Sequence, residues 1–195
     1  MQIETPRLLL RPMREQDAPQ VFAWCSEPEV GLAAGWKPHE SLEETRDLLR
    51  ESFLGQDWAF AIALRESDRP VGSIALREDA RRAGARVRSV GYALSTACWG
   101  WGLMPEALRA LAAAALESGT VDLLTAYCYP FNTRSQAVLE KCGFVRGERL
   151  ERCERRFDGC LLDWICYTLA RGESERDPAG CGDGPGLANG PRRDT

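Results

Sequence analysis

Hydrophobic and polar positions along the chain follow two periods, one typical of strands and one typical of helices. Short apolar runs bounded by turn residues predict strands, and they lie at 7–11, 58–64, 71–76, 87–94, 123–129, 145–153 and 161–169. Apolar residues at helical spacing predict helices at 17–25, at 41–54, from 105 onward and at 130–142. Together they predict a mixed, mainly antiparallel sheet of about seven strands with helices on both faces, an α+β fold in three layers.

Local signals mark where several of these elements begin and end. Ser41 and Glu44 have the spacing of a capping box, in which the serine oxygen binds an N–H three residues on and the glutamate reaches back. Gly143 suits the end of the helix before it, and Asp158–Gly159 is typical of a hairpin turn. The last two strands are therefore expected to pair with each other.

Two glycines one residue apart, Gly100 and Gly102, lead directly into a helix. Small residues let backbone N–H groups converge on an anion, and the free N–H groups and dipole of the first helical turn add to the attraction. Pro105 fits the first helical position, where a missing N–H does no harm. The segment predicts a phosphate cradle, although such glycines also make an ordinary tight turn between strand and helix.

Two sequence features that are missing near the cradle reduce the number of candidate phosphate ligands. A dinucleotide fold needs a third glycine where this chain has Pro105, and no G-x-x-x-x-G-K-[ST] sequence occurs. The chain therefore lacks the sequence motifs typical of nucleotide hydrolysis and of dinucleotide binding. The two glycines alone do not identify the phosphate ligand.

Length and charge limit the class of protein. The chain has 195 residues, of which 44% are hydrophobic, and this suits one globular domain. The formal net charge of −4 argues against a nucleic-acid partner, which needs clustered cations. Four arginines do cluster, but they flank Gly84 and predict a solvated hairpin. They are Arg81, Arg82, Arg86 and Arg88.

The cysteines and the apolar runs indicate the compartment. The eight cysteines contain no C-x-x-C pair, so they are expected to be reduced structural thiols, without a metal site. No apolar run approaches the ~20 residues of a membrane span, and no signal-peptide core occurs. The expectation is a cytoplasmic protein without a membrane partner. Residues 172–195 offer little to bury and are predicted to be a disordered tail.

Four segments in a fixed order carry a family resemblance. They are Glu4–Pro12 with Asp17–Ala18, Gly91–Leu108, Asn132–Phe144, and Asp158–Gly159 with Asp163 and Tyr167. In this order they resemble the GNAT acetyltransferase superfamily, and within it the branch of ribosomal-protein N-terminal acetyltransferases. The resemblance implies one GNAT domain at 1–171, followed by the tail.

The resemblance also implies where acetyl-CoA binds. Residues 99–104 would hold the pyrophosphate, mainly by backbone N–H groups, and the preceding strand would pair with pantetheine. The implied contacts are Leu94, Trp99, Gly100, Trp101, Gly102, Leu103, Met104, Asn132 and Ser135. Trp101 stands where a basic residue is usual, so the cradle has lost a cation or gained a ring that stacks on adenine or covers the cleft. From the residues alone, Trp101 is equally typical of an exposed or interface side chain. From the residues alone, Asn132 and Ser135 also make an ordinary helix cap.

Acetyl transfer to an amine needs a base for the attacking nitrogen and an acid for the departing thiolate. Glu154 resembles the base of this branch in position, with Glu148 and Glu151 as alternatives, and from the residues alone Glu154 is typical of a solvated ion pair. Many relatives use a tyrosine as the acid, but Leu139 stands there, so Ser135 is the hypothesis for the acid.

The implied function is an N-acetyltransferase that moves the acetyl group of acetyl-CoA to a primary amine by direct attack. Residues 31–40 and the final hairpin are expected to shape the acceptor pocket, bordered by Trp24, Trp36 and His39. From the residues alone, the two tryptophans also suit a packing role in the core, and His39 is also typical of an exposed loop histidine without function. The acceptor is a protein N-terminus or a small-molecule amine, and a homodimer is compatible with the resemblance. The alternatives are a non-catalytic acyl-CoA-binding or protein-interaction module with this fold, and a protein that binds another phosphate ligand.

Overall fold

The fold is built on one sheet of eight strands. The computed structural model describes residues 1–172, so the predicted tail lies outside the described residues except for Gly172. The strands are β1 (Ile3–Glu4), β2 (Leu8–Pro12), β3 (Ala59–Leu64), β4 (Pro70–Glu78), β5 (Val87–Leu94), β6 (Leu123–Cys128), β7 (Val145–Arg155) and β8 (Leu161–Ala170). Their order across the sheet is β1-β2-β3-β4-β5-β6-β8-β7, and only β5 and β6 pair in parallel.

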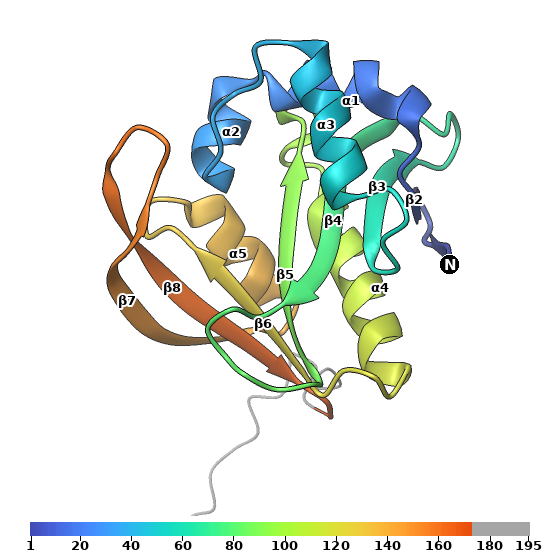
Figure 1. Ribbon diagram of the computed structural model, residues 1–195. Coiled ribbons are helices and arrows are strands. Elements are labelled where there is room, and N and C mark those ends of the chain that lie inside the picture. Colours follow the sequence, from blue (N-terminus) through green and yellow to red (C-terminus); the bar gives the residue numbers. More distant parts are fainter. Residues whose placement is uncertain (173–195) are drawn as a thin grey trace, which may run out of the picture.

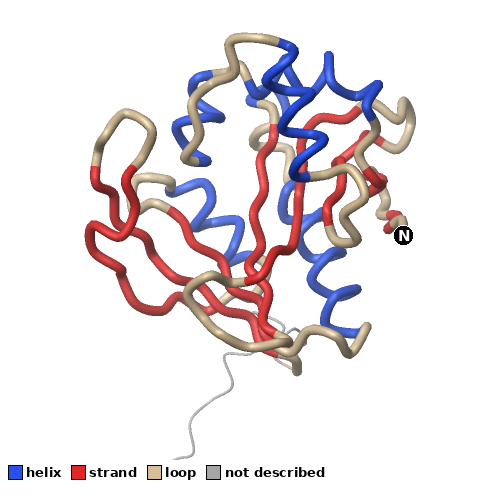
Figure 2. Tube along the Cα trace, in the orientation of Figure 1, coloured by secondary structure: helices blue, strands red, loops and turns tan. Residues whose placement is uncertain are grey.

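The helices cover both faces of this sheet, as Figures 1 and 2 show. They are α1 (Ala18–Cys25), α2 (Pro28–Ala34), α3 (Leu42–Ser52), α4 (Leu103–Glu117) and α5 (Thr133–Lys141). Buried residues of α1, α2 and α3 pack in one hydrophobic cluster, and those of α4 and α5 pack in the other. This three-layer arrangement confirms the predicted fold class.

The middle strands are buried on both faces, and their side chains divide between the two clusters. On β3, Phe60 and Ile62 join the cluster under α4 and α5, whereas Ala61 lies in the cluster under α1 and α3. Burying each large side chain contributes about 1.5–3 kcal/mol. The small residue on the α1 and α3 face lets those helices approach the sheet closely.

The seven predicted strands agree with the observed ones to within two residues at each end. The eighth strand, β1, has two residues and was not predicted. Ser41 accepts from the backbone N–H of Glu44 at 3.2 Å, as the capping box requires, but Glu44 reaches back to the N–H of Glu40 at 2.7 Å. The predicted turn at Asp158–Gly159 joins β7 to β8.

Two helix boundaries differ from prediction. The first turn of α4 begins at Leu103, so Pro105 is its third residue and not its first; proline is still tolerated there because the N–H groups of the first turn lack intrahelical partners. Part of the predicted loop 31–40 is helical, because α2 begins at Pro28 and extends to Ala34 before Gly35 ends it at φ 92°.

The parallel pair of strands opens partway along its length. β5 and β6 pair only from Val87 with Leu123 to Ser89 with Thr125, although β5 continues to Leu94 and β6 continues to Cys128. Figure 1 shows the two strands diverging beyond that point. The unpaired edges leave an opening in the middle of the sheet, with free backbone groups along it.

The predicted thiol state is consistent with the structure where it can be compared. The seven cysteines within residues 1–172 are all free, and five of them are buried. Cys181 lies outside the described residues. Within the described part of the chain, no helix is long and apolar enough to cross a membrane, and no group of three or more metal-ligating side chains comes together.

Candidate active site

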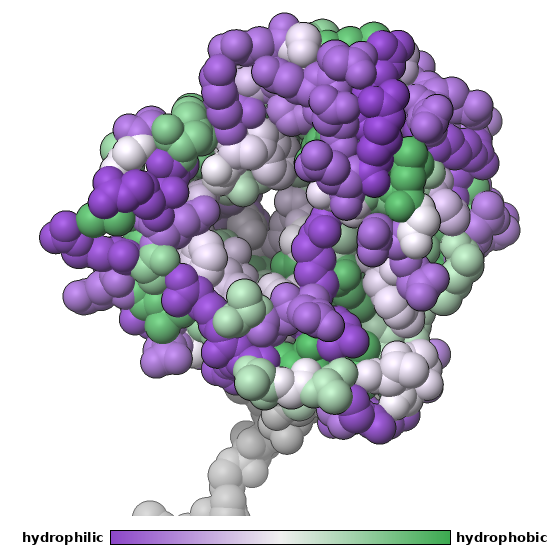
Figure 3. Space-filling view, viewed as in Figure 1, coloured by the Kyte–Doolittle hydropathy of each residue, from purple (hydrophilic) through white to green (hydrophobic). Residues whose placement is uncertain are grey.

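A cavity of about 910 Å³ occupies the opening between β5 and β6. It extends from the start of α4 to the loop after α2, and the space-filling view in Figure 3 is hollowed near its centre. Nine of the ten predicted site residues line it. They are Leu94, Trp99, Gly100, Gly102, Leu103, Met104, Asn132, Ser135 and Glu154. Residues far apart in the sequence thus meet at one site.

The predicted cradle forms one end of this cavity. Gly100 and Gly102 have φ values of 81° and 73°, which lie in the left-handed region that glycine tolerates best. The first helical hydrogen bond of α4 runs from the N–H of Glu106 to the carbonyl of Gly102, so the N–H groups of Leu103 and Met104 have no partner within the helix. Free N–H groups at the positive end of a 15-residue helix fit a pyrophosphate.

Trp99 brings a cation to the cradle that the sequence did not reveal. Its indole N–H donates to the carbonyl of Leu94 at 2.9 Å, which fixes the ring at the end of β5. The guanidinium of Arg134, from α5, lies over the ring at 4.6 Å from its centroid and also lines the cavity. Arg134 therefore supplies a positive charge beside the cradle, and only the fold brings these two segments together.

Trp101 lies apart from the other predicted residues. Its side chain is 70% exposed and lines a second cavity, of about 690 Å³, beside Arg7. Arg7 donates to the carbonyl of Trp101 at 2.8 Å, so the backbone of the loop is anchored while the ring faces solvent. A contact between this ring and the adenine of acetyl-CoA stays a prediction.

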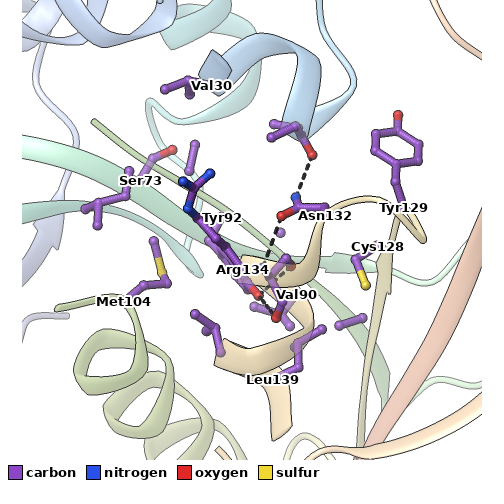
Figure 4. Close-up of a pocket in the computed structure, with 18 of the residues that line it drawn as sticks. Val30, Ser73, Val90, Tyr92, Met104, Cys128, Tyr129, Asn132, Arg134 and Leu139 are labelled. Carbon is purple, nitrogen blue, oxygen red and sulfur yellow. Dashed lines mark hydrogen bonds between the residues drawn. The ribbon is translucent and has the colours of Figure 1, made fainter. Parts of the chain in front are cut away.

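Asn132 has both ends of its side-chain amide engaged. Its oxygen accepts from the N–H of Ser135 at 3.1 Å, which makes it the N-cap of α5, and its nitrogen donates to the carbonyl of Ala33 at 3.0 Å. Figure 4 shows both bonds at the cavity wall. The side chain thus ties the start of α5 to the end of α2, and a direct contact with acetyl-CoA stays a prediction.

Ser135 is paired with a tyrosine that the sequence did not single out as a site residue. The hydroxyl groups of Ser135 and Tyr92 lie 2.9 Å apart, both residues line the cavity, and Figure 4 shows Tyr92 in its wall. Burial raises the pKa of Tyr92 above its ordinary value, against the hydrogen bond to Ser135, which lowers it. Tyr92 therefore keeps its proton and can share it with Ser135.

Glu154 lines the opposite end of the cavity and is held on one oxygen only. The hydroxyl of Tyr129 and the indole N–H of Trp164 both donate to Oε2, at 2.8 and 2.7 Å. Oε1 accepts no hydrogen bond from the described residues, so it is free to take a proton. Burial raises the pKa of Tyr129, and the bond to Glu154 raises it further, so this donor also stays protonated. The alternatives Glu148 and Glu151 are exposed and do not line the cavity.

The wall near Glu154 contains the aromatic and imidazole groups that were expected to border the acceptor. Trp24, Trp36 and His39 all line the cavity. The ring of His39 lies 2.8 Å from the hydroxyl of the buried Thr45, and burial lowers the pKa of His39 below its ordinary value. The cavity therefore combines largely apolar walls with the Oε1 atom of Glu154 and the exposed carboxylate of Glu29, which suits an amine carried on an apolar group.

The divergent parallel strands, the cradle and the cavity between them together define an acyltransferase fold of the GNAT type. The chain belongs to this family: residues 7–145 match the acetyltransferase (GNAT) domain. The uncharacterized N-acetyltransferase p20 of Bacillus licheniformis is 28% identical over 173 residues, which cover 87% of this chain and 96% of that protein.

Solved structures share the fold at lower identity. The ribosomal-protein-S5-alanine acetyltransferase of Vibrio fischeri superposes with a TM-score of 0.67 at 18% identity, covering 90% of this chain and 100% of its own. The microcin C7 self-immunity acetyltransferase MccE, solved with acetyl-CoA and AMP, gives a TM-score of 0.72 at 17% identity, covering 85% and 93%. The predicted superfamily is confirmed, and the neighbours include a member of the predicted branch.

Proposed function

We propose that this acetyltransferase transfers the acetyl group of acetyl-CoA to a primary amine that binds beside Glu154. The carboxylate carries the proposal, because within residues 1–172 both of its hydrogen-bond donors hold Oε2 and leave Oε1 free in a cavity that also contains the anion cradle. Acetyl-CoA, when bound, supplies the acetyl group as a thioester, whose C–S bond breaks as the new C–N bond forms.

At the cradle, the N–H groups of Leu103 and Met104 and the guanidinium of Arg134 fit the pyrophosphate of acetyl-CoA. The unpaired edge of β5 beyond Ser89 offers backbone groups to the pantetheine arm. The carbonyl of Leu94 already accepts from Trp99, so the free groups that serve the arm lie before Leu94 on this strand.

At the other end, Glu154 removes a proton from the amine. The group arrives as an ammonium ion, and Oε1 takes one proton so that the nitrogen can attack with a lone pair. An α-amino group, with an ordinary pKa of about 7.8, needs less help than a lysine with an ordinary pKa of about 10.4. Glu154 in a mostly apolar wall is thus better matched to an amine of low pKa.

The proton for the departing thiolate comes from the hydroxyl pair of Ser135 and Tyr92. Ser135 lies at the start of α5, and Tyr92 stands behind it at 2.9 Å. Tyr92 stays protonated and donates its hydrogen bond to the oxygen of Ser135 while Ser135 gives its own proton to the thiolate. Ser135 then regains a proton from the second N–H that the attacking nitrogen loses as the amide forms. This pair takes the place of the tyrosine that Leu139 replaces.

Two structural neighbours indicate the two kinds of acceptor that the proposal includes, a protein N-terminus and a small-molecule amine. One structural neighbour acts on a ribosomal protein, and another provides immunity to microcin C7. An N-terminal peptide and a small amine differ in size, so a panel with both kinds of amine and labelled acetyl-CoA distinguishes them by mass spectrometry.

Replacement of the base tests the proposal. Glu154→Gln keeps the shape of the side chain but cannot take a proton, so kcat should fall by about 100-fold or more at neutral pH. Thiol release from acetyl-CoA measures turnover, and Glu148→Gln on the same strand is the matched control, because that side chain is exposed. Equal kcat values for the two variants would show that Glu154 is not the base.

A further inference from the structure

The strand that carries Glu154 is irregular just before this residue. β7 pairs Leu150 with Trp164 and then Glu154 with Leu162, so it uses four steps where β8 uses two. The surplus forms a bulge at residues 151–153, and Arg152 within it has a φ of 47°. A left-handed backbone is strained for a residue with a side chain, and bulges of this kind redirect side chains beside functional sites.

The bulge decides which side chain stands opposite Leu162. In an uninterrupted antiparallel ladder, the pair of Leu150 with Trp164 is followed by the pair of Arg152 with Leu162. The two surplus residues put Glu154 there instead. Without the bulge, a guanidinium would therefore occupy the place of the carboxylate, and an ammonium group would be repelled there.

Two side chains outside β7 hold the bulge. Asp163, on β8, accepts the backbone N–H of Arg152 at 2.7 Å, and it also binds the guanidinium of Arg149. On the other side, Arg81 donates to the carbonyl of Cys153 at 2.7 Å and lies 4.6 Å from the ring centroid of Trp164. Arg81 thus has a specific contact, in addition to belonging to the predicted solvated hairpin.

These contacts continue to the carboxylate itself. The indole N–H of Trp164, on which Arg81 lies, donates to Oε2 of Glu154. The two N–H bonds that Asp163 accepts keep it charged, since they lower its pKa below the ordinary value. Asp163, the bulge, Glu154 and Trp164 therefore form one connected set at the end of the sheet.

We propose that Asp163 is a positioning residue, which holds the left-handed backbone of Arg152 through its N–H and so keeps the Glu154 carboxylate in the cavity wall. The expected loss of turnover rests on the proposed function, in which Glu154 is the base, whereas the place of the Glu154 carboxylate in the cavity wall does not depend on it. Asp163 does not line the cavity, so it acts on Glu154 only through the strand.

A rescue experiment tests the proposal. Asp163→Ala removes the acceptor, and kcat should fall by about 100-fold, the order of loss that a misplacement of about 1 Å can cause. Glycine adopts φ near 47° without strain, so adding Arg152→Gly should restore a large part of kcat although Asp163 is still missing. Asp163→Asn keeps an oxygen for the Arg152 N–H and should stay near the wild type. Asp122→Ala is the matched control. Asp122 forms an ion pair with Arg86 at 2.6 Å and does not line the cavity.

A second readout follows the placement of Glu154 without any turnover. The indole ¹H–¹⁵N resonance of Trp164, assigned by its loss in Trp164→Phe, reports the bond to Oε2. It should move in Asp163→Ala and return in Asp163→Ala/Arg152→Gly. An unmoved resonance in Asp163→Ala, or a moved one that Arg152→Gly does not return, overturns the proposal. If Asp163→Ala does not fold, Asp163→Asn decides, because a loss of kcat there as large as that of Glu154→Gln also overturns it.

The two proposals fail in different ways. If Glu154→Gln retains wild-type turnover while the Trp164 resonance moves and returns as expected, the bulge positions Glu154 but Glu154 is not the base. If Glu154→Gln loses turnover while Asp163→Ala keeps both turnover and resonance, Glu154 is the base and Asp163 does not position it.

Discussion

Gly35 allows a sharp test of how the end of α2 supports the acceptor side of the cavity. A Cβ atom at this position would lie 2.3 Å from the hydroxyl oxygen of Tyr129, whose hydrogen bond holds Glu154. Gly35→Ala therefore forces Tyr129 or α2 to move by about 1 Å to restore van der Waals contact. The substitution therefore disturbs the carboxylate of Glu154 through the side chain of Tyr129.

The cost of Gly35→Ala has two parts. The φ of 92° lies in the left-handed region, where a side chain costs about 1–2 kcal/mol. Loss of the bond from Tyr129 to a charged carboxylate costs about 1.5–3 kcal/mol more. We expect the free energy of unfolding to fall by about 2.5–5 kcal/mol in total, as measured by urea denaturation.

Gly55→Ala separates the two parts. Gly55 has a φ of 74°, but nothing lies within 4 Å of the Cβ that it would carry. This variant should lose only the backbone part, about 1–2 kcal/mol, and keep its kcat. If both variants lose the same stability and both keep kcat, the close approach of Gly35 to Tyr129 has no energetic role, and the support that we assign to α2 is wrong.

Three further predictions test the cradle, the core and the acceptor wall. Gly102→Glu should abolish acetyl-CoA binding in calorimetry, whereas Gly119→Glu should not, although both glycines have a φ of 73° and an arginine nitrogen 3.7 Å from the added Cβ. Arg11→Ala should lower the free energy of unfolding by about 3–5 kcal/mol, because it leaves the buried carboxylate of Asp17 without its partner. Burial lowers the pKa of His39 from 6.5, so the neutral ring stabilises the fold above pH 6.5 and this stability is lost as the pH falls through the lower folded value. Between pH 7 and pH 5, the free energy of unfolding should change less with pH in His39→Asn than in the wild type. An equal slope in the two proteins would contradict the lowered pKa of His39.

The fold could be predicted wherever the information is local. The strand at Val87–Leu94 was predicted to the residue, because its apolar run ends at clear turn residues. The short helix α2 was missed, because Pro28 and Gly31 within seven residues resemble a loop. Its helical form depends on packing against α1 and on the bond from Asn132, which come from elsewhere in the chain.

The site could be predicted only as a set of segments. Gly100 and Gly102 are recognisable from their local spacing before a helix, and both line the cavity. The partners of the predicted residues were not visible, since Tyr92 and Ser135 are 43 positions apart and nothing in the sequence marks a bond between them. The bulge before Glu154 was also hidden, because its left-handed residue is an arginine and not a glycine.

The last turn of α2 connects the two ends of the cavity. The carbonyl of Ala33 accepts from Asn132 at the start of α5, where we propose that acetyl-CoA binds, and Gly35 lies against Tyr129 beside Glu154. A helix of seven residues has too few turns to be stable alone. The contacts with Asn132 and Tyr129 therefore stabilise α2, and α2 in turn fixes the positions of these two side chains. An acceptor that fills the space next to Glu154 therefore meets the end of α2 as one wall, and the preference among amines should follow changes at residues 28–36 more than changes in the strands beneath.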